Sequence, residues 1–119
     1  MLDVIEVELY GKDVSDFQLS RLVRASSRKY TVPIRAFISD AVIAEDTCLG
    51  ISFGHSARDD AYGRHADGTI LQTEKIHCAR KEGRFWLLET RNGNYIIGSF
   101  KRNSGRRSFL NFIRTSERI

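Results

Sequence analysis

Residues 84–100 read RFWLLETRNGNYIIGSF, and this stretch decides the fold that we expect. Asn92 and Gly93 lie between two apolar runs, and this pair is typical of a tight hairpin turn because both residues tolerate a positive φ. The tripeptide 81–83, Lys-Glu-Gly, marks another turn shortly before it. The turns separate three strand-like runs, residues 69–80, 84–91 and 94–100. We predict that these runs pair as a three-stranded antiparallel meander.

The middle run of the meander is apolar on both faces. Phe85 and Leu87 fall on one face, whereas Trp86 and Leu88 fall on the other, because side chains alternate along a strand. A sheet of this kind is covered on both sides. The cover is either another layer of this chain or a second subunit, which leaves a homo-oligomer open.

The chain outside the meander predicts two helices and more strands. Residues 5–9 alternate apolar and acidic side chains, as a half-exposed strand does. A helix follows, capped by Asp13 or Ser15 and ending near Ser27. The amphipathic run 105–114 predicts a short C-terminal helix.

The region between the first helix and the meander is harder to interpret. Residues 30–43 fit a strand, although four apolar positions also fit a helical period, and residues 51–53 fit a strand. Residues 54–68 form a long polar loop. The expected fold class is therefore α+β in one domain, residues 1–119. It has an N-terminal strand and helix, and a C-terminal three-stranded antiparallel meander followed by a short helix.

Composition and charge narrow the function. The 119 residues are 41% hydrophobic and 29% charged, which is typical of one folded domain. Seven Lys/Arg against ten Asp/Glu give residues 1–60 a charge of −3, and twelve against five give residues 61–119 a charge of +7. The basic half predicts an anionic partner, namely a nucleic acid, a nucleotide or an acidic protein surface. The alternative is a basic face that only maintains solubility.

The first residues carry acids where a secretory signal carries basic residues, and no apolar run approaches the ~18 residues of a membrane span. We therefore expect a cytoplasmic protein without a membrane partner. His55, His65 and His77 lack the pair spacing of zinc sites. The serines around the polar loop lack the glycine pattern of a nucleophile elbow. The sequence thus predicts no catalytic residue, no metal, no cofactor and a non-enzymatic function.

The basic and aromatic residues after residue 80 predict a binding surface. Arginine grips phosphate or carboxylate groups with a planar fork, and aromatic rings stack on bases. For Tyr95 a position in the core is the alternative to a binding role, since tyrosine can bury its ring while its hydroxyl reaches water or a polar partner. The candidate partner-binding residues are Arg84, Arg91, Asn92, Tyr95, Lys101, Arg102, Arg106 and Arg107.

Three short motifs carry a resemblance: GRHADGT at 63–69, TEKI at 73–76 and TRNGNY at 90–95. In them the chain resembles small anti-defence proteins of phages and mobile elements. These include anti-CRISPR proteins and anti-Thoeris sponges that sequester a cyclic nucleotide signal. The positions that the resemblance matches are Asp67, Thr73, Thr90, Asn92 and Tyr95.

The resemblance implies a phage-encoded inhibitor of a bacterial immune system that acts in the host-cell cytoplasm. It would bind a host defence protein or complex stoichiometrically through its basic face. Two alternatives stay open: a sponge for a cyclic nucleotide signal, and a nucleic-acid-binding module.

Overall fold

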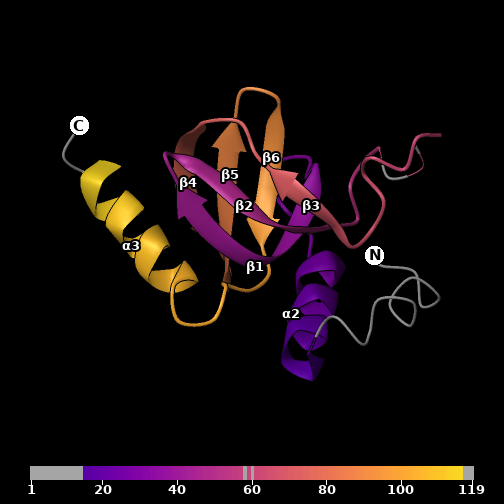
Figure 1. Cartoon of the computed structure of the whole chain (residues 1–119), viewed down its shortest axis with the longest axis horizontal. Helices are drawn as coiled ribbons and strands as arrows, with labels where there is room; N and C mark the ends of the chain where they lie inside the picture. Colours follow the sequence, from indigo (N-terminus) through magenta and orange to yellow (C-terminus); the bar gives the residue numbers. More distant parts are fainter. Residues whose placement is uncertain (1–14, 58, 60, 117–119) are drawn as a thin grey trace.

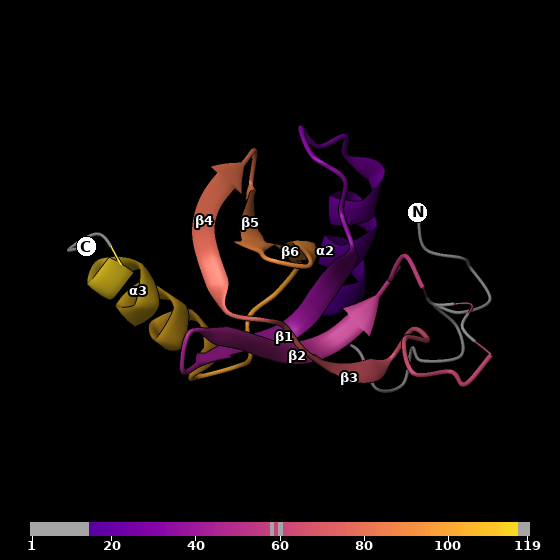
Figure 2. The ribbon, with the colours of Figure 1, turned by 90° about the horizontal axis from the view of Figure 1, so that it is seen from above.

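One mixed sheet of six strands forms the centre of the molecule, and it bends so strongly that its two halves make the walls of a trough (Figures 1 and 2). The computed structural model describes residues 15–57, 59 and 61–116. The strands are β1 (Ala36–Ala44), β2 (Thr47–Phe53), β3 (Thr69–Gln72), β4 (Ile76–Glu82), β5 (Phe85–Thr90) and β6 (Gly93–Ile97). The helices are α2 (Asp16–Ser27) and α3 (Gly105–Ser116).

The strands follow the order β3-β2-β1-β6-β5-β4. Neighbours pair antiparallel except at the centre, where β1 and β6 run parallel and Phe37 lies opposite Ile96. This parallel pair joins the two halves of the sheet. It also brings together segments about sixty residues apart in the sequence, which no local pattern predicts.

The predicted meander is confirmed for β4, β5 and β6. The first predicted run, residues 69–80, is however divided between two strands. Residues 69–72 belong to β3, which pairs with β2 at the opposite edge of the sheet. Thr73 ends that pairing: its N–H donates to the carbonyl of Cys48 at 2.8 Å, and its hydroxyl accepts the Cys48 N–H at 2.9 Å. After this anchor the chain crosses to the other wall and begins β4.

The turn chemistry also differs from the expectation. The loop between β5 and β6 consists of Arg91 and Asn92, and neither Asn92 nor Gly93 has a positive φ. A Cβ at Gly93 would meet the Cδ of Arg35 at 2.7 Å, so close packing explains this glycine. Positive φ at both central residues occurs instead between β1 and β2, at Glu45 and Asp46.

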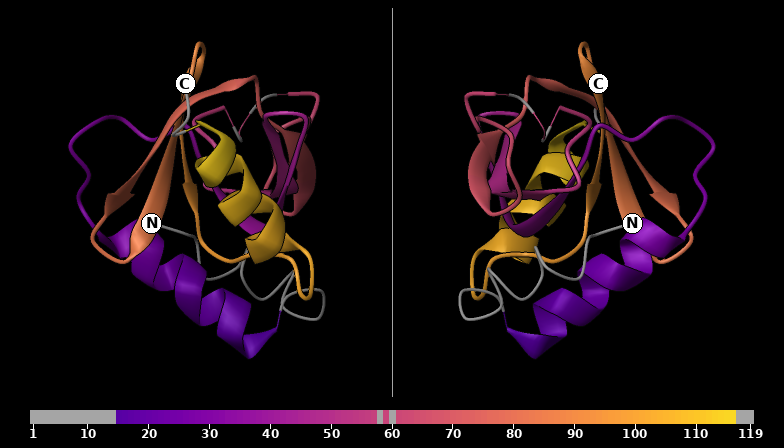
Figure 3. Two further views of the ribbon diagram at one scale, coloured as in Figure 1. Left: turned by 90° about the vertical axis from the view of Figure 1, so that its left-hand side faces the viewer. Right: turned by 90° about the vertical axis from the view of Figure 1, so that its right-hand side faces the viewer.

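Each face of the sheet is covered by one helix. Figure 3 shows α3 between the walls of the trough and α2 on the outside. Phe109 of α3 packs inside with Ile97, whereas Ala25 of α2 packs outside with Ile96. Consecutive residues of β6 thus pack into cores on opposite faces of the sheet. Both apolar faces are covered by this chain itself.

Both helices lie where the sequence places them. Ser15 caps α2 in a capping box with Gln18, and the helix ends at Ser27. Residues 30–35 contain no strand, and β1 begins only at Ala36, after Pro33. The strand predicted at residues 5–9 lies outside the described residues.

The α+β class is confirmed. No helix among residues 15–57, 59 and 61–116 is long and apolar enough to cross a membrane.

Candidate anion-binding site

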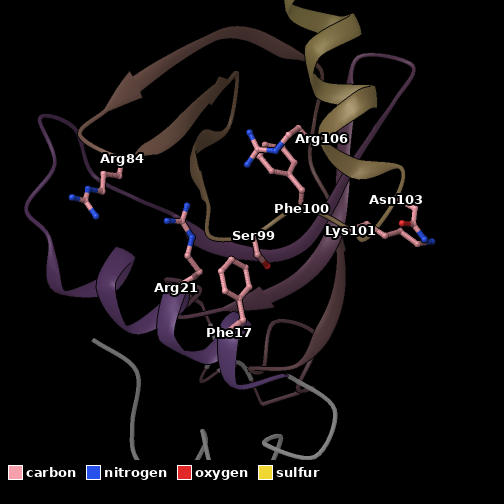
Figure 4. Close-up of a pocket in the computed structure, with 8 residues that line it drawn as sticks. All are labelled: Phe17, Arg21, Arg84, Ser99, Phe100, Lys101, Asn103 and Arg106. Atoms are coloured by element: carbon pink, nitrogen blue, oxygen red, sulfur yellow. The ribbon is translucent and has the colours of Figure 1, made fainter.

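Basic side chains from distant parts of the chain gather around one pocket of about 500 Å³ at the end of the trough (Figure 4). We call it the arginine pocket. Its lining residues are Phe17, Arg21, Arg84, Ser99, Phe100, Lys101, Asn103 and Arg106.

Three elements supply the guanidinium groups. Arg21 comes from α2, Arg84 from the tight turn between β4 and β5, and Arg106 from the first turn of α3. Gly83 has a φ of 63°, which suits the first central position of a two-residue hairpin turn and places Arg84 at the second. In Figure 4 the three guanidinium groups follow one another across the pocket.

Two of these arginines are held in place by neighbours without charge. Arg21 donates from Nε to the carbonyl of Gly98 at 3.0 Å, and its guanidinium carbon lies 4.5 Å from the ring centre of Phe85. The guanidinium carbon of Arg106 lies 4.9 Å from the ring centre of Phe100. These contacts orient the groups while most of their N–H donors stay available.

Carboxylates of the described residues do not neutralise the charges in the arginine pocket. Among residues 15–57, 59 and 61–116, no acidic side chain forms an ion pair with Arg21, Arg84 or Arg106, whereas Arg80 pairs with Glu89 on the sheet. Burial lowers the pKa of Arg21, and the charges of Arg106, Arg24 and Arg84 lower it further. Like charges held together in this way favour a bound anion.

A second hollow of about 580 Å³ adjoins the arginine pocket and shares Phe17, Ser99 and Phe100 with it. We call it the adjoining pocket. Its remaining lining residues are Ser15, Gln18, Asp40 and Arg102.

Asp40 reaches the adjoining pocket through an irregularity in β1. The register of β1 against β2 shifts between Ser39 and Val42, and Asp40 has a φ of 61°. Its backbone N–H donates to the hydroxyl of Ser99 at 3.1 Å, and the Gln18 amide lies 3.4 Å from its Oδ1. A left-handed residue held by its surroundings is a feature found at functional sites.

The predicted binding residues do not form one surface. Arg84, Lys101 and Arg106 line the arginine pocket, and Arg102 lines the adjoining one. Arg107 is exposed on α3 and lines neither pocket.

Three other predicted residues lie elsewhere. Arg91 and Asn92 occupy the turn at the opposite end of β5, where Arg35 donates to the Asn92 carbonyl at 3.1 Å. Tyr95 is buried in the core, and its hydroxyl lies 3.1 Å from Glu74 Oε1. Burial and this carboxylate raise the pKa of Tyr95 to about 12. Tyr95 therefore occupies a core position, which was the alternative to a binding role.

The site also contains residues that the sequence did not single out. Phe17 and Arg21 belong to α2, in the acidic half of the chain, and Asp40 lies in a strand whose irregularity has no sequence signal. The only hint was Phe17 itself, an aromatic residue outside the apolar stripe of the helix, with 68% of its surface exposed.

Among the described residues, the three histidines are not grouped with other metal ligands. His55 and His65 stack, but no group of three His, Cys, Asp or Glu side chains within the described ranges is placed to hold a metal ion. The chemistry that the described residues support best is thus binding of a negatively charged group.

Known proteins offer no further guide: no family model, curated protein or solved structure matches this chain.

Proposed function

We propose that this chain is a binding protein that holds a phosphate-bearing ligand, above all a nucleotide, in the arginine pocket. The observation that carries the proposal is the convergence of Arg21, Arg84 and Arg106, which no carboxylate among the described residues pairs with. Guanidinium forks bind phosphate oxygens in pairs, so three of them suit a ligand with more than one phosphate.

The size of the pocket and its aromatic wall favour a nucleotide over a bare ion. A volume of about 500 Å³ matches small-molecule sites, which span roughly 300–1,000 Å³. The exposed ring of Phe17 lies at the border of the two pockets, where a base can stack on it.

A second candidate is a larger anionic partner, either a nucleic acid or an acidic protein surface. It is favoured by Arg102 and Arg107, which are exposed and have no ion pair among the described residues. They extend the positive charge beyond the arginine pocket along the segment 101–107.

Inhibition of a bacterial immune system by a phage-encoded protein is compatible with either mode of binding. A nucleotide site suits the sequestration of a signal, whereas an extended basic surface suits occlusion of a defence complex. This role stays a prediction, as does the absence of catalysis.

Calorimetric titration with inorganic pyrophosphate and with nucleoside diphosphates tests the proposal. We expect binding that weakens as salt is added, because the contact is electrostatic. The double variant Arg84→Gln/Arg106→Gln should bind at least about tenfold more weakly, since hydrogen bonds to charged groups contribute about 1.5–3 kcal/mol each.

Arg114→Gln is the matched control, because Arg114 is an exposed arginine in the last turn of α3. It should bind as the wild type does. Equal loss in the control and the double variant, or no binding of any phosphate compound, would contradict the proposal. Binding of long oligonucleotides alone, weakened by Arg102→Gln/Arg107→Gln, would favour the second candidate.

A further inference from the structure

The adjoining pocket differs from the arginine pocket in its chemistry. The arginine pocket has three guanidinium groups and no carboxylate among the described residues that line it. The adjoining pocket has one guanidinium group, that of Arg102, together with the carboxylate of Asp40 and the amide of Gln18 beside the ring of Phe17. A carboxylate repels phosphate, so this part of the groove does not suit the same group of the ligand.

Asp40 is held in one position by contacts on two sides. Ser99 accepts its backbone N–H, and Ser99 in turn lies 3.0 Å from the buried hydroxyl of Ser39. On the other side, Gln18 is fixed by the capping box, in which its Oε1 accepts the Ser15 N–H at 2.8 Å. The backbone of Asp40 is therefore fixed beside the pocket, and its carboxylate lies next to the amide of Gln18.

The Asp40 carboxylate also has acceptor capacity left over. Among the described residues its one side-chain contact is the 3.4 Å approach of the Gln18 amide to Oδ1, and no cation there forms an ion pair with it. An ionised carboxylate has about four acceptor sites on two oxygens. It can thus accept two parallel N–H groups from one ligand.

Phe17 and Asp40 line the same pocket, so a base that stacks on the ring can reach the carboxylate with its hydrogen-bonding edge. Guanine has two adjacent donors on that edge, the ring N1–H and the exocyclic N2 amino group, and these match the two oxygens of a carboxylate. Adenine and cytosine offer one amino group beside an acceptor, and uracil offers one ring N–H between two acceptors. These acceptors would face the negative oxygens unfavourably.

We propose that the adjoining pocket selects guanine, and that the groove as a whole binds a guanine nucleotide. The base lies on Phe17 with its N1 and N2 donors on Asp40, and the phosphates lie among Arg21, Arg84 and Arg106. This inference rests on the proposed function, because the arginine pocket must first hold phosphate.

Titration of the full chain with GDP, ADP, UDP and pyrophosphate tests the inference. We expect GDP to bind about tenfold or more tightly than UDP, which is the usual discrimination of a good bidentate contact to a base. Asp40→Asn should remove this preference and leave pyrophosphate binding unchanged. Asparagine tolerates the left-handed backbone, so the variant should keep the fold.

Asp46→Asn is the matched control, because Asp46 is an exposed acid with a φ of 66° in the turn between β1 and β2. It should keep the preference for GDP. Phe17→Ala should weaken the binding of all nucleotides more than that of pyrophosphate, since stacking is lost for every base.

The outcomes separate the two proposals. If pyrophosphate and every nucleotide fail to bind, the arginine pocket is not a phosphate site and the proposed function fails. If pyrophosphate binds while GDP, ADP and UDP bind equally, the phosphate site stands and guanine selection is overturned. A guanine preference that survives in Asp40→Asn also overturns it.

Discussion

His55 and His65 stack face to face, with ring centres 4.1 Å apart and ring planes 11° from parallel. His55 is buried, and its Nδ1 accepts the N–H of Ala57 at 2.9 Å. Both histidines belong to the long loop between β2 and β3, so the pair ties the beginning of this loop to its later part.

This pair predicts that the protein loses stability in mild acid. Burial lowers the pKa of His55 to about 4, with help from the nearby charges of His65 and Arg35 and against the opposing effect of Glu74. The unfolded chain titrates near 6.5, so it takes up the proton first as the pH falls. The stability present above pH 6.5 is therefore lost progressively toward pH 4.

Urea unfolding between pH 7 and pH 5 measures this effect, since few other groups titrate there. His55→Phe keeps an aromatic ring and should flatten the pH dependence, whereas His77→Gln changes an exposed histidine of β4 and should not. A wild-type stability that does not change over this interval would contradict the prediction.

Removal of the cap of α2 should cost about 1 kcal/mol of unfolding free energy. In the wild type the Gln18 N–H donates to the Ser15 hydroxyl at 3.2 Å. In Ser15→Ala this acceptor is lost. Ser20→Ala changes an exposed serine of the same helix and should be neutral or slightly stabilising, because alanine has the higher helix propensity. Chemical denaturation of both variants compares them; equal stabilities would argue against the capping box.

A methyl group at Gly105 should be poorly tolerated. The added Cβ would meet the backbone carbonyl oxygen of Ala41 at 2.3 Å, and that oxygen already accepts the Lys101 N–H. Overpacking of this kind typically costs about 1–3 kcal/mol, and here it also pushes α3 away from β1.

Gly63→Ala separates this steric effect from ordinary backbone strain. Gly63 has a φ of 66°, but its added Cβ would meet nothing within 4 Å. Its unfolding free energy should therefore fall only by the cost of the left-handed conformation, about 1–2 kcal/mol. Gly105→Ala, but not Gly63→Ala, should also weaken pyrophosphate binding, because Arg106 moves with α3.

The docking of α3 depends on Phe109. This ring is buried between Trp86, at 4.8 Å between ring centres, and Phe100, at 5.3 Å. Phe109→Ala should lower the unfolding free energy by about 3–5 kcal/mol. Leu110→Ala changes a neighbour with 46% of its surface exposed and should cost much less. Thermal unfolding of the two variants measures the difference, and similar losses would count against this packing.

Short-range features of the fold were predictable, and long-range pairing was not. The cap at Ser15, the hairpins of β4 to β6 and the start of α3 depend on residues a few positions apart, so the sequence predicts them. The parallel pairing of β1 with β6 depends on contacts across the whole chain. The separation of β3 from β4 was missed because the Thr73 side chain, rather than a glycine or proline, makes the break.

The same distinction holds for the candidate site. Arg84, Lys101 and Arg106 were predicted because they are close together in a basic segment of the sequence. Arg21 reaches them only because α2 packs on the outside of the sheet, and Asp40 only because β1 has an irregular register. A net charge calculated separately for residues 1–60 and 61–119 cannot reveal a site to which both halves contribute residues.

The parallel seam between β1 and β6 has a consequence for the order in which a newly made chain acquires its affinity. A ribosome releases α2 and β1 first, but β1 finds its parallel neighbour only after β6 has emerged, and Arg106 follows later still. A nascent chain that ends before Arg106 should therefore lack the proposed phosphate site. The proposed affinity would then arise late, when α3 packs between the walls of the trough.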